Sequence, residues 1–258
     1  AYHRFVVGLA PSDLLSNPMG MEHMFGAITL FTRAVFLIPL LFLVTGAWRM
    51  YSFTMKGMRI PLRFYLAELK TFVIHMVSQR QMRVCAVEQR QKRWLGHWLL
   101  GFAFAAMSVI LFFFLAWFQT DGIYPLYHPQ RWLGYLITAV MIAVPAQILA
   151  GRIRKKEPMH KFSEREDVAL PVVLLLTAIS GIAVHIFRYA GLALTCHFAY
   201  AIHLEIAVPL LVIELPFGKL SHVIYRPLAI YFQAVSDRAA LERSEAPAQP
   251  VPQEARVA

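Results

Sequence analysis

Residues 203–222 read HLEIAVPLLVIELPFGKLSH, an apolar run with a histidine at each end and two glutamates inside. At about 1.5 Å of rise per residue, the two histidines lie roughly 28 Å apart on a straight helix, close to the thickness of a bilayer's hydrocarbon core. An ionisable residue inside such a span is costly and is usually kept where it faces a cavity, a partner or a cofactor. The stretch therefore predicts a membrane helix with a candidate ligand near each face, although each histidine alone is also consistent with a residue solvated at the interface.

The rest of the chain has the composition of an integral membrane protein. Its 258 residues are 58% hydrophobic and 13% aromatic, which is more apolar than a soluble globular domain. Apolar segments long enough to cross a bilayer occur five times. We therefore expect an all-α, five-helix transmembrane bundle, with spans at residues 25–48, 97–120, 132–151, 168–190 and 199–220.

The basic residues predict the orientation of this bundle. They are dense at residues 49–93 and 152–165, whereas residues 121–131 contain a single basic residue, Arg131. The positive-inside rule then places the N-terminus outside and the C-terminus in the cytoplasm. The net charge of +10 is explained by these topology signals, so we do not expect nucleic-acid binding.

Three regions follow from these patterns. Residues 1–24 form an outer N-terminal segment, residues 25–232 the membrane domain, and residues 233–258, which end in an Ala, Pro, Glu and Gln mixture, a flexible cytoplasmic tail. Residues 60–89 mix apolar side chains with Arg and Lys, which predicts an amphipathic helix on the inner membrane surface. Such a helix docks a soluble partner or anchors to acidic lipids, and the pattern does not separate the two.

Cysteine does not supply a cofactor site in this sequence. Cys85 and Cys196 are expected on opposite sides of the membrane, and no C-x-x-C or C-x-x-C-H motif occurs. Histidines are the remaining candidates, and they collect at the ends of the spans. His97 and His222 are expected at one depth on the cytoplasmic side, whereas three lie near the outer side: His185, His197 and His203. Each face thus offers a candidate pair of imidazoles for a bis-histidine haem.

The ending LPFGKLSH, residues 215–222, resembles the membrane cytochrome b family of the nitrate reductase gamma subunit. It is still more similar to the membrane subunits of heterodisulfide reductase, of the sulfite-reduction-associated Dsr complex and of the quinone-interacting Qmo complex. The likeness covers residues 25–232. It implies two b haems stacked across the bacterial or archaeal cytoplasmic membrane, passing electrons between menaquinone or ubiquinone and a cytoplasmic iron–sulfur or flavoprotein subunit. The chain is then a multi-pass subunit of an oxidoreductase complex rather than a stand-alone enzyme.

By position, the resemblance implies that His97 and His222 bind the inner haem and that His203 binds the outer one. The spacing from His203 to His222 is nineteen residues, whereas the nitrate reductase subunits have eighteen, so a straight helix would rotate one histidine by about 100°. Pro209 removes one helical hydrogen bond, and an associated kink or π-bulge would absorb the extra residue.

The second ligand of the outer haem departs from the family pattern. Where those subunits have a further histidine ten residues after the first, this chain has Met107. On straight helices His185 lies at the depth of His203, so we expect a His185/His203 pair, with Met107 or His197 as substitutes. Met107 is equally explained by ordinary packing.

Haem propionates need cations, and four basic residues are candidates. Arg33 and Arg188 are expected to serve the outer haem, and Arg93 and Lys219 the inner one. Snorkelling to the surface is the alternative for Arg33.

A quinone site is expected near the outer haem, drawing on Arg188, Tyr189, Glu205 or His128. Glu205 or Glu214 would take up quinol protons or simply pair with an arginine. The alternative function is a non-redox membrane anchor or small proton-coupled transporter, although the five spans contain no evident inverted repeat.

Overall fold

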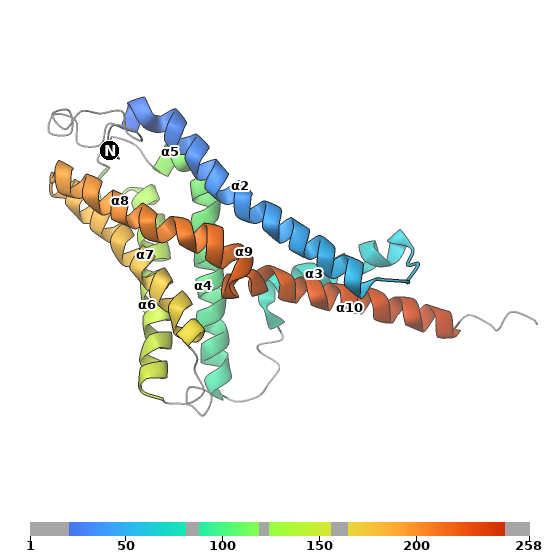
Figure 1. Cartoon of the computed structure of the whole chain (residues 1–258). Coiled ribbons are helices and arrows are strands. Elements are labelled where there is room, and N and C mark those ends of the chain that lie inside the picture. Colours follow the sequence, from blue (N-terminus) through green and yellow to red (C-terminus); the bar gives the residue numbers. More distant parts are fainter. Residues whose placement is uncertain (1–20, 81–87, 119–123, 156–164, 246–258) are drawn as a thin grey trace, which may run out of the picture. The chain divides into compact units, whose positions relative to one another are not determined.

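The computed structural model is all helical in the parts of the chain that it describes, residues 21–80, 88–118, 124–155 and 165–245 (Figure 1). The elements are α2 (Met21–Thr54), α3 (Leu62–Ser78), α4 (Glu88–Phe113), α5 (Leu115–Phe118), α6 (Pro129–Ile153), α7 (Arg165–Tyr189), α8 (Ala193–Pro209), η4 (Leu210–Glu214), α9 (Leu215–Phe217), η5 (Lys219–Ser221) and α10 (His222–Glu245). Cys85, most of the expected N-terminal segment and residues 246–258 lie outside the described residues.

Five of these helices are long and apolar enough to cross a membrane, which confirms the predicted number of spans. Their spanning parts are Thr29–Thr54, Gln91–Phe113, Pro129–Ile153, Asp167–Tyr189 and Ala193–Phe217. The predicted segments match these helices with shifts of up to seven residues at the ends. The N-terminus-out orientation stays a prediction.

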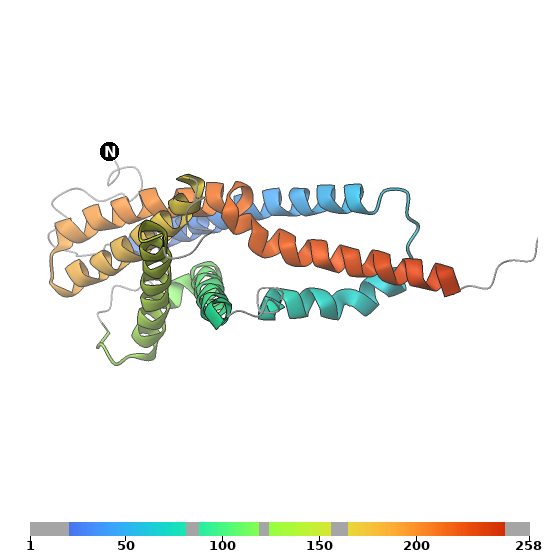
Figure 2. The same cartoon turned by 90° about the horizontal axis from the view of Figure 1, so that it is seen from below.

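The chain divides into two compact units. The first comprises residues 1–44 and 85–222 and holds most of the membrane-spanning helices. In it α7 packs against both α6 and α8, and α4 packs against α6 (Figure 2). The buried core residues come from α4, α6, α7, η4 and η5: Ala103, Ile110, Ile137, Met141, Leu174, Ala178, Leu210 and Leu220.

The start of α6 shows how local sequence positions a functional side chain. Pro129 occupies the first turn, where its fixed φ suits a helix start and its missing N–H costs nothing. His128 precedes it in an extended conformation, and the backbone N–H of Arg131 donates to the His128 carbonyl at 2.8 Å. Residues 128–131 are therefore held rigidly at this end of the bundle.

The second unit comprises residues 45–84 and 223–258 and contains α3 and most of α10. Its core is formed by Met55, Phe64, Phe232, Val235 and Ala239. Two ion pairs, Arg63 with Glu242 and Arg238 with Glu68, join α3 to α10.

Among the groups of this second unit whose pKa values are shifted are Glu68 and Tyr65. The Thr71 hydroxyl, which donates to Glu68 at 2.7 Å, and the Arg238 guanidinium hold the pKa of Glu68 below its usual range. Burial raises the pKa of Tyr65 to about 12. Both groups lie outside the five spans.

The predicted amphipathic helix and the predicted flexible tail both fall in this unit. Helix α3 does form within residues 60–89, and the side chains of Leu62, Leu66 and Val73 are exposed on it. Residues 233–245, assigned from sequence to the flexible tail, belong to α10 because Val235 and Ala239 are buried there. The position of α3 at a membrane surface stays a prediction.

Candidate functional site

The fifth span is not a uniform α-helix. Directly after Pro209, residues Leu210–Glu214 form a π-helical turn, in which each bond spans five residues and one extra residue is accommodated. We predicted such a turn from Pro209 and from the nineteen-residue spacing, and it is confirmed. The turn shifts the register of the helix before the LPFGKLSH ending begins.

The span then ends at Phe217, three residues earlier than expected. Gly218 is extended, with φ −92° and ψ −163°, and its carbonyl accepts from the Ser221 hydroxyl at 2.8 Å. A Cβ at Gly218 would lie 2.9 Å from the Glu214 carbonyl oxygen, which is closer than real contacts allow. His222 consequently begins α10 after the short η5 turn, so the expectation that His203 and His222 share one helix is corrected.

His222 and His97 face each other in the structure. Their Nε2 atoms are 3.4 Å apart and their rings lie 5.6 Å apart at 47°. The Nδ1 of His222 contacts the carbonyl of Lys219, which is an acceptor only, so the proton is on Nδ1 and the Nε2 lone pair is directed at His97. Two imidazoles on one metal need a separation of about 4 Å, twice a metal–nitrogen bond. The pair is therefore close to the geometry of axial ligands.

Lys219, three residues before His222 in the chain, takes part in a cluster of ion pairs. The Lys219 ammonium donates to Asp167 at the start of α7, and Arg152 at the end of α6 lies 3.4 Å from the same carboxylate. Lys219, expected to hold a propionate, is thus already engaged by Asp167. Arg93, the other cation predicted here, is half-buried in the first turns of α4.

A cavity of about 250 Å³ lies toward the opposite end of the first unit, where α7 ends and α8 begins. Its wall is mostly apolar and comes from α2, α4, α5, α6, α7, α8 and η4. The polar side chains that line it include Gln130, Arg131, Tyr135, His185, Arg188 and His203. No Asp or Glu is among the described residues that line it.

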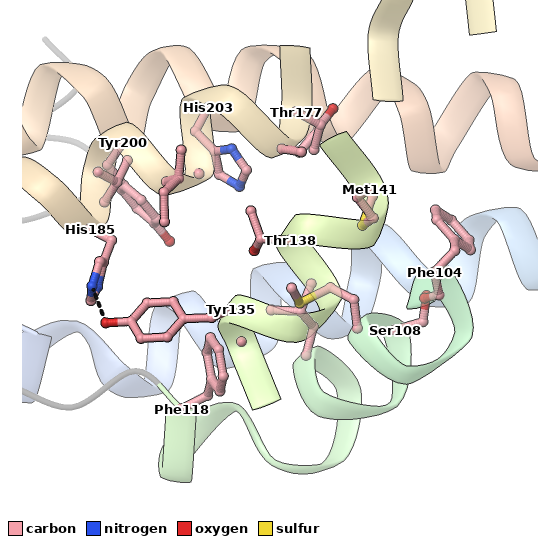
Figure 3. A pocket seen from close by; sticks show the side chains of 18 of the residues that line it. Phe104, Ser108, Phe118, Tyr135, Thr138, Met141, Thr177, His185, Tyr200 and His203 are labelled. Carbon is pink, nitrogen blue, oxygen red and sulfur yellow. Dashed lines mark hydrogen bonds between the residues drawn. The ribbon is translucent and has the colours of Figure 1, made fainter. Parts of the chain in front are cut away.

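His203 points its ring into this cavity (Figure 3). Its Nδ1 lies 2.9 Å from Ser180 Oγ, whose own hydrogen is donated to the Thr177 carbonyl, so His203 Nδ1 is the donor. The lone pair is then on Nε2, and this outer-shell bond fixes the ring as in known metal-binding histidines. Gly181 lies beneath the ring, because a Cβ there would approach His203 Cε1 to 3.2 Å.

The expected partner of His203 has a hydrogen bond of its own. His185 lines the same cavity, and its Nε2 lies 2.8 Å from the Tyr135 hydroxyl (Figure 3). Met107 also lines the cavity, whereas His197 is buried on α8 and is not among the lining residues. The structure therefore brings His185, His203 and Met107 to one cavity, and their role as haem ligands stays a prediction.

Arg131 and Gln130 are the residues that sequence reasoning missed. Both are buried, with exposed fractions of 7% and 0%, and both line the cavity. The Arg131 guanidinium lies 5.9 Å from the Tyr124 ring and 5.5 Å from the Tyr189 ring. From sequence alone, Arg131 counts only as a topology signal, because it directly precedes the apolar span predicted at residues 132–151. Arg33, the predicted cation, is exposed on α2.

Other candidates are not gathered at a site. Glu205 is exposed and Glu214 half-buried in the fifth span, and Cys196 is buried with its thiol 3.5 Å from the Val184 carbonyl. Within the described ranges, no three His, Cys, Asp or Glu side chains gather to hold a metal ion. The histidine pair and the cavity are accordingly the candidate sites.

Comparisons with known proteins give one match. The model of a family described as CitB, citrate utilization protein B, matches residues 8–244. No curated protein and no solved structure matches the chain. The matched family is not the membrane cytochrome b family that the LPFGKLSH ending resembles, so that resemblance and the haem ligands that it implies stay predictions.

Proposed function

We propose that this chain, which belongs to the citrate utilization protein B family, is the membrane electron-transfer subunit of a citrate-utilization system. Its task would be to carry electrons between the quinone pool and a cytoplasmic iron–sulfur or flavoprotein subunit through two b haems. Five helices able to span a membrane and two histidine sites at opposite ends of one unit support this function.

The observation that carries the proposal is the His97/His222 pair. Two imidazole Nε2 atoms 3.4 Å apart, one of them with its proton fixed on the far nitrogen, form a donor set suited to a haem iron. Two such rings without a shared ligand would bring lone pairs together or share a single proton. Haem supplies reversible one-electron reduction and oxidation when it is bound by two imidazoles.

The cavity is the proposed second haem site. His203 offers Nε2 with its tautomer fixed by Ser180, and Gly181 leaves space beside the ring. The apolar wall excludes water, which favours a flat, mostly apolar macrocycle. Either His185, once released by Tyr135, or Met107 would complete the ligand set.

Charge supports an orientation for the two sites. Arg152 lies in the last turn of α6, and Arg154 and Lys155 follow the helix. Asp167 pairs with Arg152 and also with Lys219, in the turn before His222. By the positive-inside rule this end is cytoplasmic, in a bacterial or archaeal membrane. The His97/His222 site would then hand electrons to the soluble partner, and the cavity site would face the quinone.

The proposal extends to α3. Its exposed Leu62, Leu66, Leu69, Val73 and Val77 recur at helical spacing and form one stripe, flanked by Lys70. An apolar stripe beside a cation suits a helix lying on an anionic inner leaflet.

A reduced-minus-oxidised visible spectrum of the chain purified in detergent tests the function. We expect a b-type α band, about two haems per chain by haem extraction, and reduction of both on addition of menadiol, a soluble quinol. Absence of the band contradicts the proposal and leaves the non-redox anchor or proton-coupled transporter. A band that menadiol does not reduce contradicts the quinone assignment alone.

A further inference from the structure

Arg131 is a buried cation in the wall of an apolar cavity. Its exposed fraction is 7%, and its Nε and Nη2 atoms have no hydrogen-bond partner among the described residues. The rings of Tyr124 and Tyr189 give cation–π contacts at 5.9 and 5.5 Å, which are at the long end of their useful range. Such contacts leave the in-plane N–H donors unused.

An unpaired buried charge is expensive. Taking a guanidinium out of water costs several kcal/mol unless a counter-charge and hydrogen bonds compensate it, as a general estimate for buried ions. Burial does not lead Arg131 to deprotonate, because a guanidinium stays charged in proteins. The arrangement is therefore explained best by an anionic group that completes it.

The surroundings of Arg131 specify the charge of that group. The other charged or titratable side chains that line the cavity are Arg188, Tyr135, His185, Tyr200 and His203. None of these lining residues carries a carboxylate, so the cavity has an excess of positive charge and of donors. A planar guanidinium with adjacent Nε and Nη2 matches a carboxylate with two parallel hydrogen bonds.

The rest of the wall specifies the body of the ligand. Most lining side chains are apolar, such as Phe36, Phe104, Met141 and Leu211. A small polar anion would place its charge against these apolar side chains. A larger apolar molecule with a carboxylate would pack against them while its carboxylate binds Arg131. The ligand class is therefore an amphiphilic carboxylic acid.

We infer that Arg131 is the carboxylate anchor of the cavity, and that it holds a propionate of the haem whose iron His203 binds. This inference rests on the proposed function for the identity of the ligand, but the carboxylate chemistry itself does not. It replaces Arg33, exposed on α2, as the main cation for this haem.

Redox titration of purified variants is the first test. Arg131→Gln removes a cation near the cavity haem, so we expect its midpoint potential to fall, because a nearby positive charge favours the reduced state. The potential of the His97/His222 haem should stay unchanged and reports that the chain is folded. Arg131→Lys should keep the midpoint potential of the cavity haem close to that of the unmodified chain. Arg154→Gln, at the C-terminal end of the same helix, should change neither the midpoint potential of the cavity haem nor the folding of the chain. A shift in Arg33→Gln with none in Arg131→Gln would overturn the inference.

Binding without iron is the second test, and it separates this inference from the proposed function. Chain produced in haem-deficient cells is titrated with protoporphyrin IX and with its dimethyl ester, following porphyrin fluorescence. We expect the free acid to bind more tightly than the ester, and Arg131→Gln to remove roughly 10- to 100-fold of its affinity, as for a hydrogen-bonded charge. Equal affinity of acid and ester in the unmodified chain would contradict a carboxylate anchor.

A third test uses a second pair of ligands to distinguish a haem propionate from another carboxylate. Laurate and dodecanol share an apolar chain and differ in the carboxylate. One outcome is a chain that purifies without haem and does not bind the porphyrin acid, but that prefers laurate to dodecanol and loses this preference in Arg131→Gln. Arg131 would then be a carboxylate anchor, whereas the propionate assignment and the proposed function would both be wrong. If Arg131→Gln leaves the affinities for both laurate and the porphyrin acid unchanged, the inference fails while a haem band would still support the proposed function.

Discussion

The two ends of the first unit present histidines in opposite ways. At one end, His222 is exposed and is placed by a helix break, and its ring meets His97 among ion pairs that include Asp167. At the other end, His203 projects from an unbroken helix into an apolar cavity, with buried Arg131 in the wall. This contrast is consistent with the proposed function, in which the first site would exchange electrons with a partner outside the bundle and the second would enclose a ligand away from water.

Loss of a ligand should give the largest difference between the ends. We expect His222→Ala and His97→Ala to remove the same haem and His203→Ala to remove the other, because each variant deletes one axial ligand. Haem content per chain and low-temperature spectra measure this. His75→Ala, on α3 in the second unit, is the matched control and should retain both haems. Loss of one common haem in all three site variants would contradict the presence of two separate haem sites.

Gly218→Ala should disturb the exposed site alone. The added Cβ would meet the Glu214 carbonyl oxygen at 2.9 Å, and such overpacking costs about 1–3 kcal/mol. We expect the His97/His222 haem to be partly lost and the cavity haem to be retained, as measured by redox titration of the two components. Gly96→Ala is the control beside His97, since its Cβ would find Val144 at an ordinary 3.6 Å. An equal loss of both haems would mean that the turn acts on the whole fold.

Gly181→Ala should give the smallest effect, at the cavity. Its Cβ would lie 3.2 Å from His203 Cε1, so the ring must tilt, at a cost of about 0.5–1.5 kcal/mol for a strained side-chain torsion. We expect the cavity haem to remain bound with altered electron paramagnetic resonance g-values, while the signal of the other haem is unchanged. Unaltered g-values at both sites would place His203 outside the ligand set.

Much of this architecture follows from the sequence. Five apolar segments predict five helices able to span a membrane, and Pro209 together with a nineteen-residue spacing predicts the π-helical turn. These features depend on composition and on helical geometry, which are local. His97 and His222 also meet as expected, because both lie at span ends of one depth.

The remaining features depend on contacts between distant segments. The helix ends at Gly218 in an extended conformation without a positive φ, and Glu214 lies so close that a side chain there would clash, so the glycine alone did not indicate the break. Arg131 is buried because α7 brings Tyr189 against it, which no pattern within α6 reveals. Residues 233–245 read as polar tail because their apolar positions are few, yet Val235 is fully buried by α3 and α10 packing.

The π-helical turn at Leu210–Glu214 also allows the helix to accommodate a change of one residue in its length. A one-residue insertion in an α-helix is absorbed as such a turn, and the matching deletion restores the regular helix without moving the segments on either side. Homologues with eighteen or nineteen residues between the two histidines can therefore place them equivalently. A search that fixes this spacing would separate proteins that share both sites, whereas one that allows a single gap after Pro209 would align them.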